Sequence, residues 1–364
     1  MTPRERILSA IKHELPDKIP AHFINIDEIS PYLKYYNLAN KEELANRTGV
    51  CIRRIWPDYK KELSEEESNR LNTGLYEDMK PIGLFGTSGG VDSYSTETGH
   101  MMPFSDIKTV KEIENYTWPN PDDWDFSKIG EKIDKYNDQY AIMLGSWNPI
   151  FDQVLDFFSM EKAMEYLYLQ PKLIEATVAY VEDFYLKFYL KYFKAAKGKA
   201  DIFSMGDDFA GQRGMLISPK MWKKFLMPTY AKLFALAKEF NLHVWFHSCG
   251  AIEPVIGYLI DIGMDVWETV QAHLPGNEPK YIKREYGKNI TFFGAINTQQ
   301  TLPFGKPEEV RMEVRERIRI LGKGGGYICG PDHHIKPHFP IKNVIVMIDE
   351  IKSFRGSGYT IGLF

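Results

Sequence analysis

The pattern of hydrophobic and polar positions along the chain predicts eight short β-strands. Runs rich in β-branched and aromatic residues recur between clusters of turn-forming residues, as is typical of strands. The later runs are apolar at nearly every position instead of alternating, which indicates parallel strands that are covered on both faces. The eight runs are residues 19–24, 50–55, 141–147, 200–205, 242–247, 264–267, 290–296 and 326–329.

Helix-like segments separate the later runs, because apolar residues recur at three- and four-residue spacings in residues 219–240 and 307–321. At the N-terminus, Thr2 and Glu5 have capping-box spacing and Pro3 follows the cap, so we expect a helix to begin there. Alternating strands and helices predict an α/β fold with a parallel sheet. Eight strands favour a (β/α)8 TIM barrel, and an open doubly wound sheet is the alternative.

Residues 56–130 do not follow this alternation. Segment 60–69 looks like a charged, solvated helix, segment 83–99 has the Gly, Ser and Thr content of a hairpin, and segment 118–124 is rich in turn residues. We interpret 56–130 as an elaboration inserted into a single barrel domain that spans 1–364. This elaboration would serve as a lid or as an interface.

Composition and charge narrow the classes of partner. The 364 residues are 44% hydrophobic and carry a formal net charge of −4, with Lys and Glu interleaved. This pattern offers no basic surface for nucleic acid or for an anionic membrane. Three widely spaced cysteines cannot form a disulfide framework, and neither a signal-peptide pattern nor a membrane-spanning apolar run is present. We expect a reduced, cytoplasmic protein that acts on small molecules or proteins.

Three side chains at predicted strand ends form a candidate metal site. His247 and Cys249 lie two residues apart, so their side chains share one face if the strand continues, and Cys329 ends another apolar run. One imidazole and two thiolates suit Zn²⁺ with a fourth position open for substrate. The alternative is that both cysteines are buried as small hydrophobic residues and that the histidine is hydrogen-bonded in the core.

Other polar residues follow predicted strands and are candidate catalytic groups. Asp207 and Asp208 could act as acid or base, or could instead cap the next turn. His334, beside Asp332 and His333, could shuttle a proton or orient a ligand, and loop capping is the alternative.

The candidate substrate contacts are Trp147, Tyr327 and Glu268, all at strand ends. The two aromatic residues, together with Trp267, could line an apolar pocket, although barrel cores also hold such residues. Glu268 could alternatively be a fourth metal ligand or a salt-bridged residue. Cys51 has no evident partner and is predicted to be a core thiol.

Several motifs together carry a family resemblance. They lie in residues 1–7, 16–20, 118–122, 206–208, 212–214, 217–219, 246–250, 294–299, 302–304 and 325–329. In these motifs the chain resembles the uroporphyrinogen decarboxylase superfamily, and within it the zinc- and corrinoid-dependent methyltransferases of the methylcobamide:coenzyme M methyltransferase type. The most specific element is His247-Ser-Cys249 with Cys329, which is similar to the His-x-Cys…Cys zinc signature of those methyltransferases.

The resemblance implies a (β/α)8 barrel with zinc at its mouth, and a methyl group that passes to or from the cobalt of a corrinoid. The chain lacks an Asp-x-His-x-x-Gly cobalamin motif, so the corrinoid would arrive on a separate protein that docks on the mouth, with 56–130 as a candidate contact. The small substrate would be a methoxylated aromatic, another methyl donor or a thiol.

Two alternative functions stay open. Decarboxylases of the superfamily grip substrate carboxylates with arginines after the first strand, whereas segment 21–28 contains none. A metal-free decarboxylase-like lyase that uses Asp207 or Asp208 is the first alternative, and a non-enzymatic module that binds metal or a corrinoid protein is the second. Asn297 stands where the family motif usually has aspartate, and we assign it no role.

Overall fold

The computed structural model describes residues 1–61, 75, 84–85, 87, 102–136, 138–145 and 147–354. Most of the expected helix at 60–69 and of the expected hairpin at 83–99 lies outside the described residues.

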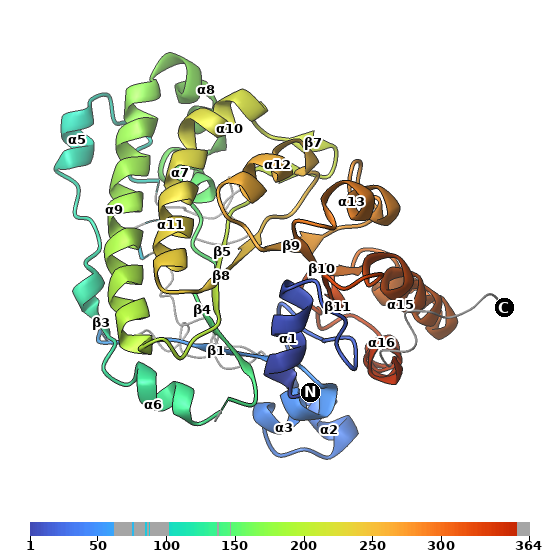
Figure 1. The fold of residues 1–364 in the computed structure, drawn as a ribbon. Helices are drawn as coiled ribbons and strands as arrows, with labels where there is room; N and C mark the ends of the chain where they lie inside the picture. The colour runs from blue at the N-terminus through green and yellow to red at the C-terminus, as the bar shows by residue number, and fades with distance from the viewer. Residues whose placement is uncertain are drawn as a thin grey trace.

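A seven-stranded parallel sheet forms the centre of the fold (Figure 1). From β4 onwards its strands are buried at every position but one, which is why these runs are apolar throughout. The predicted parallel α/β architecture is therefore confirmed. In spatial order the strands are β1 (Ile52–Ile55), β4 (Ala141–Leu144), β5 (Ile202–Gly206), β8 (His243–His247), β9 (Val266–Val270), β10 (Thr291–Ile296) and β11 (Tyr327–Pro331).

The predicted strand at 19–24 is present only as an extended segment. Ala21 forms parallel bridges to Val50, just before β1, and to Cys329 in β11. The Cys329 N–H also donates to the carbonyl of Pro20, at 2.9 Å. Because proline has no N–H to donate, this segment cannot pair continuously. It nevertheless lies between the first and last strands of the sheet.

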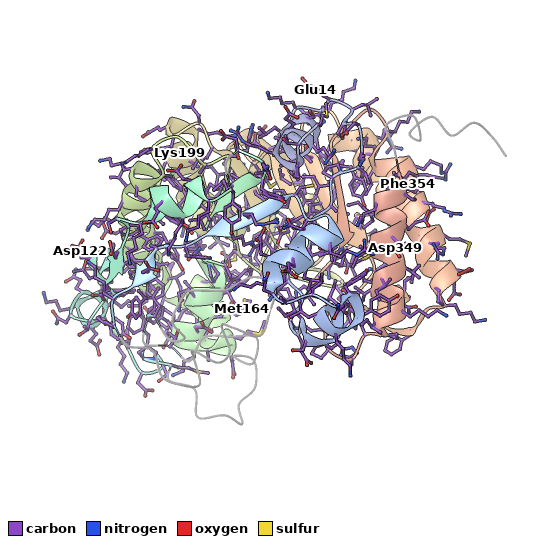
Figure 2. The ribbon with its side chains drawn as sticks, turned by 90° about the horizontal axis from the view of Figure 1, so that it is seen from below. Glu14, Asp122, Met164, Lys199, Asp349 and Phe354 are labelled. Atoms are coloured by element: carbon purple, nitrogen blue, oxygen red, sulfur yellow. The ribbon has the colours of Figure 1, made fainter. Side chains whose placement is uncertain are left out.

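Helices flank the sheet, with α9 and α11 side by side on one flank and α15 and α16 on the other (Figure 1). Lys199, just after α9, and Asp349 in α16 lie on opposite sides of the molecule (Figure 2). Within the described residues, every helix is too short or too polar to cross a bilayer. The helices are α1 (Pro3–Ile11), α2 (Ser30–Tyr36), α3 (Lys41–Thr48), α5 (Val110–Glu114), α6 (Ile129–Asp134), α7 (Phe151–Phe158), α8 (Met160–Leu169), α9 (Pro171–Ala196), α10 (Pro219–Phe225), α11 (Met227–Glu239), α12 (Glu253–Asp261), α13 (Pro279–Tyr286), α14 (Thr301–Phe304), α15 (Pro307–Leu321) and α16 (Ile341–Ser353).

Three of the predicted helix features can be compared directly. The helix at 307–321 is confirmed as α15, and the N-terminal capping box is confirmed because Thr2 and Glu5 accept each other's backbone N–H. The predicted helix at 219–240 is instead two helices, α10 and α11, which meet at Leu226. Pro228 lacks the N–H that a continuous helix would require there.

Helix α1 covers the N-terminal ends of the strands. Its Arg4 pairs with Asp201, just before β5, at 2.8 Å, and the carbonyl of Ala10 accepts from the hydroxyl of Thr291, at the start of β10. Apolar residues of α1 join a buried cluster with inward-facing strand residues such as Trp245. Cys51 belongs to this cluster, which confirms it as a core thiol. The opposite, C-terminal end of the sheet carries the candidate site.

The described part of the 56–130 elaboration packs on α9. A two-stranded antiparallel sheet joins β2 (Asp58–Tyr59) to β3 (Trp124–Asp125). Trp118 stacks on Tyr180 of α9, with ring centroids 4.9 Å apart and planes 7° from parallel. The turn at 118–124 is confirmed as a loop and a short 3-10 helix at Pro121–Asp123. These residues form a layer outside the helices.

Candidate metal centre

His247, Cys249 and His333 come together at the C-terminal end of the sheet. Their ligand atoms all lie within 4.8 Å of one another, and His247 Nε2 is 3.4 Å from Cys249 Sγ. His247 ends β8, whereas His333 follows β11, so strands far apart in the sheet supply the group. Two imidazoles and one thiolate are a donor set that suits Zn²⁺.

Glu268 holds the other ring nitrogen of His247. Its Oε1 lies 2.7 Å from His247 Nδ1, and its Oε2 accepts from the indole N–H of Trp245. A carboxylate on Nδ1 favours the tautomer whose Nε2 can bind a metal. Burial would raise the pKa of Glu268, but the hydrogen bond and charge of His247 outweigh it and lower the pKa to about 2. Both oxygens are thus engaged, and Glu268 lies behind the candidate ligand His247 rather than at the cavity.

A Glu268→Gln variant is expected to bind zinc about 10- to 100-fold more weakly than the wild type, as is usual when a ligand loses its outer partner. The amide offers one acceptor oxygen, whereas two N–H groups, from Trp245 and His247, require acceptors. Competition with a chromogenic chelator measures the affinity. Glu350→Gln is the matched control, because Glu350 is equally buried but pairs with Arg315 of α15. Equal affinities in the two variants would contradict an orienting role.

Cys329 does not join this group. On β11, Ile328 packs in the same buried cluster as α1 and Trp245, which we call the inner cluster. Side chains alternate along a strand, so Tyr327 and Cys329 point to the opposite face, toward the helices. The Tyr327 hydroxyl donates to the carbonyl of Gly294 and to Cys329 Sγ, 2.8 and 3.4 Å away. Burial raises the pKa of Cys329 to about 12. The structure thus leaves both residues, predicted as ligand and substrate contact, in the packed layer.

His333 takes the place that the sequence analysis gave to Cys329. Burial, with the charges of His334 and His247 contributing, lowers the pKa of His333 to about 3. A neutral imidazole has the lone pair that a metal ligand needs. The sequence predicts an orienting or proton-shuttling role in this loop, but the direct approach of His333 depends on the orientation of β11, which the residue types alone do not give.

Asp207 lies within the fold rather than at the mouth. It is fully buried, and its carboxylate accepts from the backbone N–H groups of Ile150, Phe151 and Asp152 at 2.7 to 3.0 Å and from the hydroxyl of Tyr230. Burial raises its pKa to about 6. The carboxylate thus caps the start of α7, which precedes Asp207 in the chain, rather than the next turn as the alternative expected.

Asp208 and Trp147 lie beside His247, although neither is among the described residues that line the neighbouring cavity. Asp208 Oδ1 accepts from the backbone N–H of Cys249 at 2.7 Å and lies 4.0 Å from His247 Nε2. The Trp147 ring stands edge-on to the His247 ring, with centroids 5.5 Å apart. Gly206 permits this approach, because a Cβ there would lie 2.8 Å from the Trp147 ring.

His334 lies beside the metal-binding group but is held away from it. Its Nδ1 is 2.8 Å from Asp27 Oδ1, and Lys336 Nζ is 2.9 Å from the other oxygen of Asp27. Burial would raise the pKa of Asp27, but these two partners lower it to about 2. His334, predicted as a catalytic residue, thus lies at the rim of the neighbouring cavity.

A cavity of about 530 Å³ opens onto Cys249 and His333. Among the described residues that line it, none is acidic and none is Trp or Tyr. Amide, hydroxyl, imidazole and ammonium groups provide its polar side-chain atoms, and Phe304 and Phe339 provide phenyl rings. The described lining comprises Ala210, Gly211, Gln212, Cys249, Gly250, Gln271, Thr298, Gln299, Pro303, Phe304, His333, His334, Lys336, His338 and Phe339.

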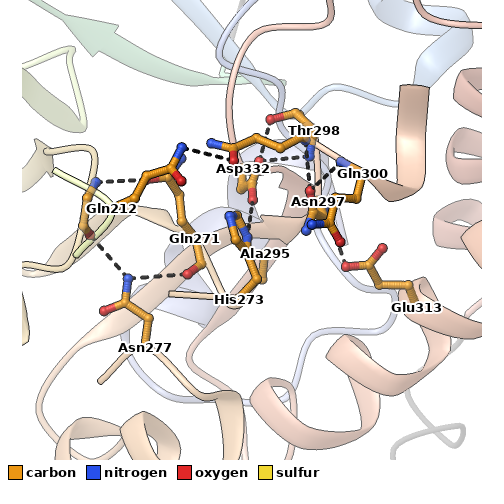
Figure 3. A network of polar contacts seen from close by, with 12 residues as sticks. Gln212, Gln271, His273, Asn277, Ala295, Asn297, Thr298, Gln300, Glu313 and Asp332 are labelled. Carbon is orange, nitrogen blue, oxygen red and sulfur yellow. Dashed lines mark hydrogen bonds and ion pairs between the residues drawn. The ribbon is translucent and has the colours of Figure 1, made fainter. Parts of the chain in front are cut away.

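A polar network supports one wall of this cavity (Figure 3). Gln271 accepts from the N–H of Gly250, immediately after Cys249, at 2.7 Å. Gln212 donates to Gln299 across the cavity at 3.1 Å, and thereby links the loop after β5 to the loop after β10. Thr298 donates its N–H and hydroxyl to the buried Asp332. The backbone on both sides of the metal-binding group is therefore fixed.

Known proteins match this chain in sequence and in fold. The chain is 26% identical over 117 residues to a methylated-thiol–coenzyme M methyltransferase of Methanosarcina mazei; the match covers 32% of this chain and 29% of that relative. The solved structure of a methyltransferase from Methanosarcina mazei has a similar fold, with a TM-score of 0.60 and 18% identity over 96% of this chain and 98% of the other. The model of the uroporphyrinogen decarboxylase (URO-D) family matches residues 156–354. Since this match spans more than half of the chain, the protein belongs to the URO-D family.

Proposed function

We propose that the protein is a zinc-dependent methyltransferase that moves a methyl group between a small substrate and the cobalt of a corrinoid carried by a separate protein. The observation that carries the proposal is the convergence of His247, Cys249 and His333 beside a cavity. Three protein ligands leave a zinc ion one position for substrate. When bound there, zinc supplies a Lewis acid that holds a thiol as thiolate or polarises a methylated oxygen or sulfur.

The remaining residues of the site prepare this chemistry. Glu268 fixes the ring of His247, and Trp147 covers one side of that ring, so the ligand has little freedom to rotate. The inner cluster below the site excludes water from the N-terminal side. Substrate therefore enters from the cavity, at the C-terminal end of the strands, as in other barrels.

The lack of tryptophan and tyrosine among the described lining residues favours a thiol or a methylated thiol over a methoxylated aromatic. Of the described lining residues, those with polar side chains offer mainly N–H and hydroxyl donors, and tryptophan and tyrosine do not occur among them. The similar methyltransferase of Methanosarcina mazei bears a name that includes methylated thiols and coenzyme M, which agrees with this preference. Transfer in either direction is compatible with the same site.

The corrinoid protein would dock on the rim of this cavity. We propose that Ala21, which bridges both edges of the sheet, closes it into a (β/α)8 barrel with one open mouth. Phe304, 80% exposed on that rim, is a candidate contact, whereas the described part of the elaboration lies on α9. The three cysteines are free thiols, in keeping with a reduced, cytoplasmic setting.

Metal analysis followed by a methylation assay tests the proposal. We expect about one zinc per chain in the purified protein. We also expect zinc-dependent methylation of cob(I)alamin from methylated thiols, followed by its absorbance change, or methylation of a thiol in the reverse direction. The same assay with a panel of methoxylated aromatics as methyl donors compares the two substrate classes, and we expect the methylated thiols to react faster. A zinc-free protein that decarboxylates a porphyrinogen at full rate would instead establish the lyase, and a zinc protein inert in every assay would indicate a binding module.

A further inference from the structure

We propose that Gln271 is a specificity-determining residue, which donates its amide N–H groups to an oxygen that the substrate carries in addition to its sulfur. The inference rests on the proposed function, because it requires a thiol or a methylated thiol in the cavity beside Cys249 and His333. It assigns a substrate contact in the wall of that cavity, outside the group of candidate metal ligands.

Gln271 lies at the C-terminal end of a central strand. It directly follows β9, which ends at Val270, and so it lies at the same edge of the sheet as His247 at the end of β8. The residue is only 4% exposed, yet it lines the cavity together with Cys249 and Gly250. Its side chain is therefore part of the cavity wall and not of the outer surface.

The amide oxygen of Gln271 is held by the backbone beside Cys249. It accepts from the N–H of Gly250 at 2.7 Å. The fully buried Asn277 donates from its Nδ2 to the carbonyls of Gly250 and Gln271, at 3.2 and 3.3 Å (Figure 3). Gly250 has a φ of +93°, and a Cβ there would lie 2.6 Å from the carbonyl oxygen of Ala210. The backbone next to Cys249 is thus fixed, and it fixes the Gln271 amide in turn.

The amide nitrogen of Gln271 is the end that is left for a ligand. The oxygen must face the Gly250 N–H, because the reversed amide would set donors against each other. Within the described part of the chain, no group accepts from this nitrogen. Water in the cavity can serve as its acceptor, but a substrate that fills the cavity displaces that water. The N–H groups then need an acceptor on the substrate itself.

Other polar side chains of the lining are bonded within the protein. Gln212 donates to Gln299 at 3.1 Å, and the hydroxyl of Thr298 donates to Asp332 at 2.6 Å. None of the described lining residues is acidic, so a substrate oxygen meets no carboxylate there, whether it is neutral or anionic. Gln271 therefore combines a fixed position, burial and N–H groups that remain to be satisfied.

This arrangement selects among thiols. A plain alkyl thiol would cover the Gln271 N–H groups without accepting from them, whereas a thiol that bears an oxygen group replaces the displaced water. A hydrogen bond to a charged acceptor contributes more than one to a neutral acceptor. We therefore expect affinity to rise from an alkyl thiol to a hydroxyalkyl thiol and further to a carboxyalkyl thiol.

Calorimetric titration of the full-length, zinc-loaded protein tests this order. The probes are 1-propanethiol, 3-mercapto-1-propanol and 3-mercaptopropionate, which have equal carbon number, with ethanethiol and mercaptoacetate as a shorter pair. We expect the wild type to bind a carboxylate probe about 10- to 100-fold more tightly than its alkyl counterpart. Gln271→Met should abolish this preference, because it removes the donors. Gln271→Glu keeps an oxygen for the Gly250 N–H, so the wall stays in place, and its charge should reverse the preference.

Gln300→Met is the matched control, because Gln300 lies on the loop after β10 but outside the described lining of this cavity. It should leave all affinities within about twofold of the wild type, and every variant should retain zinc and a native circular dichroism spectrum. Equal wild-type affinities within both pairs of thiols, or an undiminished preference in Gln271→Met and Gln271→Glu, would overturn the inference alone. A wild-type protein that holds no zinc and binds none of the thiols would instead overturn the proposed function.

Discussion

A His333→Ala protein is expected to lose its zinc, whereas a Cys329→Ala protein is expected to keep it. His333 lies with His247 and Cys249 in one group of ligand atoms, whereas Cys329 contacts Tyr327 on the other face of β11. Removing a direct ligand should weaken zinc binding by more than about 100-fold, the upper end of the effect of an outer partner. The Cys329→Ala change removes only one buried sulfur, which should cost about 1 kcal/mol of stability.

Elemental analysis of the dialysed proteins and competition with a chelator measure this difference. His334→Ala is the control for the loop, because His334 adjoins His333 in sequence but bonds to Asp27. It should retain zinc, so a loss that occurs in His333→Ala alone reports a lost ligand rather than a disturbed loop. Zinc bound by His333→Ala and absent from Cys329→Ala would restore the ligand set that the sequence indicated.

The contrast between His333 and Cys329 explains how far sequence reasoning reached at the site. His247 and Cys249 could be predicted together because they are neighbours on one strand end, so their spacing alone sets their relation. The third ligand depends on which face of β11 each residue occupies and on where that strand ends. A shift of one residue reverses the face of every side chain. Asp207 and Asp208 diverge for the same reason, since the first points into the fold and the second to the metal group.

More of the fold than of the candidate site can be predicted from the sequence. Strands covered on both faces must be apolar throughout, so a continuous apolar run such as 290–296 predicts a buried strand directly. The segment 19–24 shares the apolar pattern, but Pro20 interrupts its hydrogen bonding. Its bridges to residues at both edges of the sheet are a long-range property that the local pattern does not contain. Pro228 encodes the break at Leu226 locally, but the apolar spacing continues through the break and therefore predicts one helix.

Replacing Asp207 with alanine is expected to destabilise the protein by about 3 kcal/mol, the scale for breaking a buried charged hydrogen-bond group. The change leaves the first N–H groups of α7 and the hydroxyl of Tyr230 without their acceptor inside the fold. Urea unfolding monitored by circular dichroism measures the free energy. Tyr230→Phe, which removes one of the partners, should cost less, about 1 kcal/mol.

The ionisation of Asp207 adds a pH signature to this prediction. Burial raises its pKa from 3.8 to about 6 in the folded state, so the folded protein binds the proton more tightly than the unfolded chain. This tighter proton binding stabilises the folded state in full below pH 3.8. The stabilisation declines by about 1.4 kcal/mol per pH unit as the pH rises to about 6. The stability difference between the wild type and Asp207→Asn should therefore shrink across this window. If Asp207→Ala is as stable as the wild type but inactive in methyl transfer, this carboxylate serves catalysis instead. A carboxylate that supports α7 would weaken the fold when it is removed.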